Sequence, residues 1–183
     1  HQPLFEAFWQ RALTLGRIPA NDEFEQSTAL KAITGSHRKA MNLLEQIYDL
    51  GKLEQAKTEH QQDLLVYLAL NLFGKRKPYT HYPPELQRDL KALFGHYKEA
   101  QDQARTLLFA IADHQAIENA CSTAHQQLPA SLLHAGHSLI FHKDYLSQLP
   151  SLLRVYVGAA CQLYGDLDDI DLIKIHITSG KVS

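Results

Sequence analysis

The sequence predicts a mainly α-helical, multi-helix fold with a small β-α-β element near its C-terminal end. Along the first two thirds of the chain, apolar residues recur at helical spacing, and glycines separate one such segment from the next. Short strand-like runs occur only in the last third, at 138–142 and 172–177, on either side of a helical segment.

The first part of the chain is expected to hold a series of helices that end at glycines. Gly16, Gly35 and Gly51 are predicted to terminate the first three helices, because glycine readily adopts the left-handed conformation found after a helix. Ser36 is placed to cap the third, since its hydroxyl can accept from a free backbone N–H. The expected ranges are about 3–15, 19–34, 37–50 and 53–73.

A segment rich in proline and positive charge follows, and it is predicted to be a linker at 75–84. The predicted organisation is thus a helix-turn-helix-like N-terminal subdomain at 1–74, this linker, and a helical subdomain with the small sheet at 85–183. Its last strand enters a turn with no return strand after it, so the chain is expected to be a piece of a longer protein. The further helices are expected over about 84–94, 96–112, 114–125 and 145–164.

The amino-acid composition limits the classes of protein to which the chain can belong. Of the 183 residues 45% are hydrophobic, and 18 Lys and Arg stand against 20 Asp and Glu, which excludes a disordered or highly charged tail. The longest apolar run, 64–73, is half of the roughly 20 residues that a membrane helix needs, so no membrane partner is expected. Cys121 and Cys161 are too few for a disulfide framework, which favours a cytoplasmic location.

Two segments 60 positions apart resemble each other. Leu30–Ala40 and Leu90–Ala100 share five of eleven residues, and each describes a helix, a glycine break and the start of a second helix. The similarity indicates an internal duplication. A chance match between two amphipathic helices explains it as well.

The first of these segments is the strongest candidate site. In a helix-turn-helix the second helix enters the major groove by its N-terminal residues, where basic and amide side chains contact phosphates and bases. The basic triplet in the linker would add backbone contacts. The alternative is an ordinary helical hairpin with a solvated basic face. The candidate nucleic-acid-binding residues are Ser36, His37, Arg38, Lys39, Asn42, Lys75, Arg76 and Lys77.

Other patterns give weaker signals. A group of histidines with one cysteine lies within 22 residues, but it lacks the closely paired ligands of a zinc site. An acidic run at 166–171 lacks the glycine and terminal glutamate of a calcium loop. The glycine spacing excludes the common phosphate-binding and nucleophile motifs, so no catalytic residue is assigned. The group comprises Cys121, His125, His134, His137 and His142.

Five segments, taken together in chain order, carry a resemblance to a known family: 63–70, 86–97, 152–156, 172–176 and 180–183. With these segments, the chain from about Gly16 onward looks like the C-terminal part of the DNA phosphorothioation-associated methyltransferases. That family belongs to bacterial systems that put sulfur into the DNA backbone or restrict DNA lacking it. A glutamate expected after Arg154-Val155-Tyr156 is replaced by Val157.

The resemblance implies a parent protein with a separate methyltransferase domain that binds S-adenosylmethionine, whereas no cofactor is expected in this chain. The leading expectation is a noncatalytic region that recognises double-stranded DNA. The alternative is a docking module that binds the parent's own methyltransferase domain or another protein of the defence system.

Overall fold

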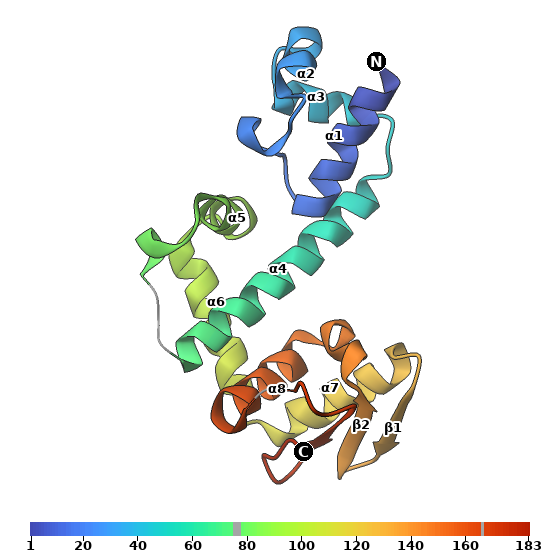
Figure 1. Cartoon of the computed structure of the whole chain (residues 1–183), viewed down its shortest axis with the longest axis vertical. Coiled ribbons are helices and arrows are strands. Elements are labelled where there is room, and N and C mark those ends of the chain that lie inside the picture. The colour runs from blue at the N-terminus through green and yellow to red at the C-terminus, as the bar shows by residue number, and fades with distance from the viewer. Residues whose placement is uncertain (75–77, 166) are drawn as a thin grey trace. The chain divides into compact units, whose positions relative to one another are not determined.

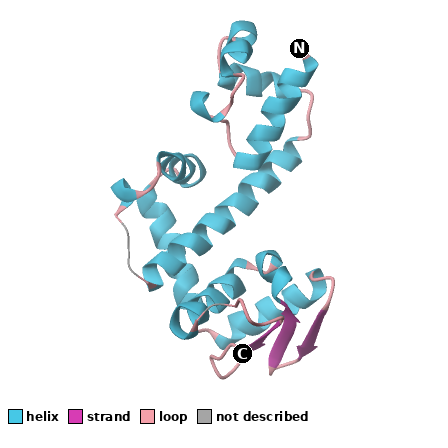
Figure 2. Ribbon diagram, in the orientation of Figure 1, coloured by secondary structure: helices cyan, strands magenta, loops and turns pink. Residues whose placement is uncertain are grey.

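The structure is a computed structural model that describes residues 1–74, 78–165 and 167–183 (Figure 1). It confirms the predicted fold class, because helices dominate the chain and the strands gather in its C-terminal part (Figure 2). Contacts divide the chain into unit 1, residues 1–62 and 83–96, and unit 2, residues 63–82 and 97–183. Each unit is built from two separate stretches of the chain, so this division differs from the predicted ranges 1–74, 75–84 and 85–183.

Unit 1 is helical, and its core is built from the apolar faces of its first helices. Phe8, Trp9 and Ala12 on one helix pack with Leu30 and Met41 on the next two, and all five are buried. The first part of the long helix α4, Leu50–Phe73, also belongs to this unit. The other elements are α1 Gln2–Leu15, η1 Asn21–Glu23, α2 Ser27–Thr34, α3 His37–Leu44 and α5 Pro84–Phe94.

Unit 2 places α7 (His114–Gln127) and α8 (Ser151–Tyr164) against a three-stranded antiparallel sheet. The strands are β1 (Ser131–His134), β2 (Ser138–His142) and β3 (Leu172–His176), and they lie in this order in the sheet (Figure 1). Phe141 pairs with Ile173, and Leu139 with Ile175, so one face of the sheet is apolar and buried against α7 and α8. Cys121 in α7 lies in this core, where burial raises the pKa of its thiol to about 12. The other elements are η2 Tyr79–His81, α6 Tyr97–Ala110 and η3 Lys143–Gln148.

Three local expectations need correction. Gly51 does not end a helix but lies in the first turn of α4, where its N–H donates to the Asp49 carboxylate at 2.9 Å. The expected helix 19–34 is broken, because the chain becomes extended at the buried Phe24 between η1 and α2. Strand β1 was missed, since four residues are too few to show a clear alternation. After β3 the chain turns back, and Val182 bridges to Ile175.

The two similar segments also match in local structure. Gly35 and Gly95 both have positive φ, 84° and 77°, and each donates its N–H to the carbonyl four residues earlier. The buried positions correspond as well, since Leu30, Leu90, Ala40 and Ala100 are fully buried. Whether duplication or chance explains the similarity, we refer to residues 27–44, which contain Leu30–Ala40, as the first copy and to residues 87–104, which contain Leu90–Ala100, as the second copy.

Gly16 is required both by its backbone conformation and by its close packing. Its φ is 63°, and a Cβ there would lie 3.0 Å from the carbonyl oxygen of Ala56 and from Cα of Lys57. At Gly95, φ is 77° but a Cβ would meet no described atom within 4 Å. Gly95→Ala should therefore cost only the backbone strain of its positive φ, about 1–3 kcal/mol.

Gly16→Ala should cost about 1–3 kcal/mol more than Gly95→Ala, because backbone atoms must also move apart. The free energy of unfolding can be followed through the fluorescence of Trp9, the only tryptophan of the chain. If the two variants lose the same free energy of unfolding, Gly16 does not pack tightly against the backbone of α4.

A buried ionic network links parts of unit 1 that are distant in sequence. The Arg17 guanidinium donates to both Glu23 carboxylate oxygens, at 2.7 and 2.8 Å, and to Asp89 on α5 at 2.7 Å. His60 on α4 lies 3.2 Å from the second Asp89 oxygen, and Arg88 pairs with Asp22 and Glu23. The Arg17, Glu23 and Asp89 side chains are 7%, 5% and 12% exposed. The network therefore holds α5 against the end of α1.

These contacts make unit 1 sensitive to acid. Hydrogen bonds from Arg17 lower the pKa of Glu23 from 4.5 to about 2, even though burial opposes the shift. A carboxyl with a lowered folded-state pKa contributes stability above its unfolded pKa and loses it as pH falls towards its folded pKa. The free energy of unfolding, followed through Trp9 fluorescence, should therefore drop by about 2–3 kcal/mol between pH 5 and pH 2.

Glu23→Gln should flatten this pH dependence. Glu25→Gln removes an exposed carboxylate outside the network and should leave the dependence in place. An unchanged slope in Glu23→Gln would show that other groups cause the acid sensitivity.

Candidate nucleic-acid interface

The turn between α2 and α3 is short and well defined. The Gly35 N–H donates to the carbonyl of Lys31 at 2.8 Å, which closes the end of α2. Ser36 follows as the N-cap of α3, and its hydroxyl accepts from the Lys39 N–H at 3.2 Å. Two helices joined by a glycine and a capping serine are thus present where they were predicted.

The side chains of α3 divide into two faces. Ala40, Met41 and Leu44 are buried in the core of unit 1. Arg38, Lys39 and Asn42 are exposed. Since Asn42 lies four positions after Arg38 and three after Lys39, these three side chains share one face of the helix. The structure therefore brings together three of the predicted contact residues on an accessible surface.

His37 does not belong to this surface. Its side chain is buried, and it has a hydrogen-bond partner at each ring nitrogen: Ser27 Oγ at 2.9 Å and the Pro19 carbonyl at 2.8 Å. The expectation that His37 contacts DNA directly is wrong for this conformation. His37 lies three, four and seven positions before the buried α3 residues, so its place on the buried face was visible in the sequence.

All charged residues of the first copy are basic. The first copy, 27–44, contains Lys31, Arg38 and Lys39 and no Asp or Glu. The second copy, 87–104, contains three basic and three acidic residues and has no net charge. Only the first copy therefore presents an excess of positive charge. The linker residues Lys75, Arg76 and Lys77, predicted as supporting contacts, lie outside the described residues.

Neither alternative ion site receives support. His125 Nδ1 is hydrogen-bonded to Ser131 Oγ at 2.8 Å, and His142 Nδ1 lies 3.3 Å from a carboxylate oxygen of Asp144. Across 1–74, 78–165 and 167–183, no group of three or more His, Cys, Asp or Glu side chains could hold a metal ion. Of the acidic run, Asp166 lies outside these ranges.

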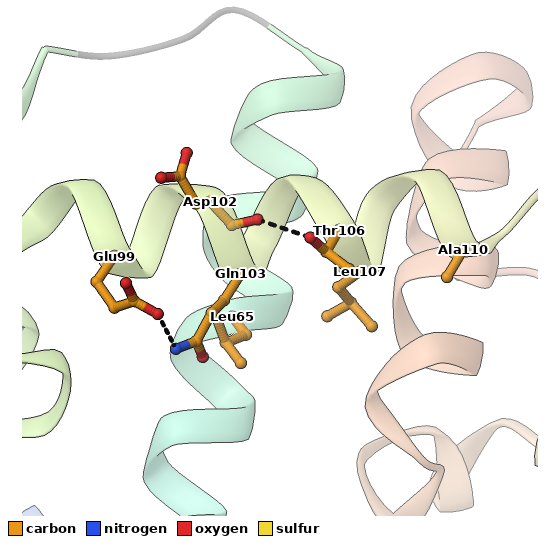
Figure 3. A pocket seen from close by; sticks show the side chains of 7 residues that line it. All are labelled: Leu65, Glu99, Asp102, Gln103, Thr106, Leu107 and Ala110. Atoms are coloured by element: carbon orange, nitrogen blue, oxygen red, sulfur yellow. Dashed lines mark hydrogen bonds between the residues drawn. The ribbon is translucent and has the colours of Figure 1, made fainter.

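Two apolar surface grooves are relevant to the docking alternative. One, of about 500 Å³ in unit 2, runs along α6, with Leu65 of α4 and Leu107 on its apolar side (Figure 3). Glu99 and Asp102 line it too, and Gln103 donates to Glu99 at 2.8 Å.

The other groove, of about 490 Å³, lies in unit 1 and is lined by Phe5, Leu43, Ile47 and Tyr48 among others. Ile47 is 75% exposed, and Leu43 is also exposed. Exposed apolar side chains that gather in one groove are typical of a protein contact surface.

No protein-family model, curated protein or solved structure matches the chain. Among the helices of the described residues, none combines the length and hydrophobicity needed to cross a membrane.

Proposed function

We propose that the chain is a noncatalytic helical region of a DNA phosphorothioation-associated methyltransferase and that α3 binds duplex DNA. The sequence resemblance supports the parent protein, whose separate methyltransferase domain would bind S-adenosylmethionine. The exposed face of Arg38, Lys39 and Asn42 supports the DNA contact. Arg and Lys neutralise phosphates, and an amide side chain such as Asn42 can pair with a base edge.

The position of these residues on the helix strengthens the proposal. The backbone N–H groups in the first turn of α3 have no carbonyl partner within the helix. The helix dipole adds a partial positive charge at the same end. Arg38 and Lys39 add two full charges to this turn, and no carboxylate of the first copy opposes them. A phosphate group is the ligand that this combination favours.

Removing both charges should weaken DNA binding and its dependence on salt. Each phosphate contact contributes about 0.9 to the slope of log K against log salt, so Arg38→Ala/Lys39→Ala should lower that slope by about 2. The measurement is a mobility-shift titration on duplex DNA at several salt concentrations, with and without phosphorothioates.

Lys91→Ala/Lys98→Ala is the matched control. It removes the same charge from the second copy, where Lys91 and Lys98 are also exposed. This control should bind DNA like the unmodified protein. Equal losses in both double variants would indicate a nonspecific charge effect and would contradict a specific role of α3.

The second candidate function is docking of the parent's methyltransferase domain, and the exposed apolar groove at Leu43 and Ile47 favours it. This function requires no salt-dependent binding to DNA. Ile47→Lys should then abolish association with the methyltransferase domain in a binding titration, while leaving DNA binding unchanged. Retained association in Ile47→Lys would contradict docking at this groove.

A further inference from the structure

The imidazole of His37 joins three segments of unit 1. His37 is the first residue of α3 and is 6% exposed. Its Nδ1 lies 2.8 Å from the carbonyl oxygen of Pro19, and its Nε2 lies 2.9 Å from Ser27 Oγ at the start of α2. The ring also makes edge contacts with Phe8 and Phe24, with centroids 4.9 and 6.1 Å apart. The start of α3 is therefore fixed from several sides.

The hydrogen-bond partners define the tautomer. A carbonyl oxygen can only accept, so Nδ1 must carry the proton that is donated to Pro19. In the neutral ring, Nε2 then accepts from the Ser27 hydroxyl. Both polar atoms of the buried ring are satisfied in this arrangement.

We infer that His37 is a positioning residue for the DNA-binding turn. This inference rests on the proposed function of Arg38 and Lys39. Successive residues of an α-helix are related by a fixed rotation, so a fixed side chain at position 37 determines the directions in which the next two leave the helix. Ser36 holds the same turn through the Lys39 N–H. The turn is therefore ordered before any ligand arrives, which lowers the entropic cost of binding.

The first test does not involve DNA. A long-range ¹H–¹⁵N correlation spectrum should show the tautomer protonated at Nδ1. His37→Ala should speed hydrogen exchange at the Lys39 amide by about tenfold, after correction for the change in global stability. Leu44→Ala makes a cavity at the other end of α3 and, after the same correction, should leave Lys39 exchange nearly unchanged. Equal corrected rates in His37→Ala and the unmodified protein would overturn the inference.

The second test measures binding to a short DNA duplex at a temperature where circular dichroism shows each variant folded. His37→Ala should weaken binding by about tenfold, and Leu44→Ala should not. His37→Asn keeps an N–H donor near the position of Nδ1 and should recover most of the affinity.

The outcomes separate the two proposals. If His37→Ala binds normally while Arg38→Ala/Lys39→Ala does not, the positioning role is wrong and the DNA-binding function stands. If the unmodified protein shows no salt-dependent binding, the DNA-binding function fails. In that case the exchange rates alone decide whether His37 orders the turn.

Discussion

Arg17→Ala should lower the free energy of unfolding of unit 1 by about 3–5 kcal/mol, one of the largest effects expected for a single substitution in this chain. The reason is the state of the partners that remain. Glu23 and Asp89 would keep their charges in a largely buried site but would lose the guanidinium that both contact. Removing one partner of a buried ion pair costs far more than the net value of the pair.

The lowered pKa values of both carboxyls also indicate that Arg17 stabilises their charged forms. Hydrogen bonds from Arg17 lower the pKa of Glu23 to about 2. Burial alone would raise the pKa of Asp89, but hydrogen bonds from His60 and Arg17 outweigh it and hold that pKa below its ordinary value. Arg17 therefore stabilises the charged form of both carboxyls.

The measurement is denaturant unfolding followed by Trp9 fluorescence. Lys57→Ala is the matched control, because it also removes a cation of unit 1, one that forms an exposed pair with Glu54. This control should change stability by less than about 1 kcal/mol. Arg17→Lys should recover only part of the loss, since an ammonium cannot make the bidentate contact. A loss below about 1 kcal/mol in Arg17→Ala would contradict the structural role of the network.

Most of the helices could be predicted from the sequence because their signals are local. Gly16 and Gly35 end helices, and Ser36 caps α3, as their conformational preferences indicate. Gly51 was misread because the same residue type also fits a first turn, where here its N–H donates to the carboxylate of Asp49. A local signal therefore places a boundary well but does not always say which end it marks.

The ionic network could not be predicted, because its parts are far apart in the chain. Arg17 and Asp89 are separated by 72 positions, and no local pattern links them. Each looks like an ordinary surface charge until α5 is placed beside the end of α1. The grouping of α5 with unit 1 was missed for the same reason, since the proline-rich segment before it indicated a subdomain boundary.

The candidate site was predicted in part. The spacing of Arg38, Lys39 and Asn42 is enough to place them on one helix face. The same periodicity assigns His37 to the opposite, buried face. Histidine is common in DNA contacts, however, and this residue type led to the wrong expectation that His37 contacts DNA directly. Ser27 and Pro19 are the hydrogen-bond partners of the two ring nitrogens of His37. Only the tertiary fold brings these partners to the ring, so the local sequence does not reveal them.

Phe8→Ala should destabilise unit 1 by about 3–5 kcal/mol, which is the usual cost of removing a fully buried phenylalanine. Phe8 has 0% exposure and makes edge contacts with both Phe24 and His37. The cavity would therefore open beside the imidazole that holds the start of α3. Trp9 fluorescence reports the loss, and hydrogen exchange at Lys39 should increase as well.

Phe8→Leu should cost only about 1–2 kcal/mol, because leucine fills most of the space. Phe109→Ala is the control, since that side chain is 70% exposed and belongs to unit 2. It should leave the Trp9 transition in place. A Phe8→Ala variant as stable as Phe8→Leu would show that the core of unit 1 closes around the missing ring, and α3 would then not depend on it.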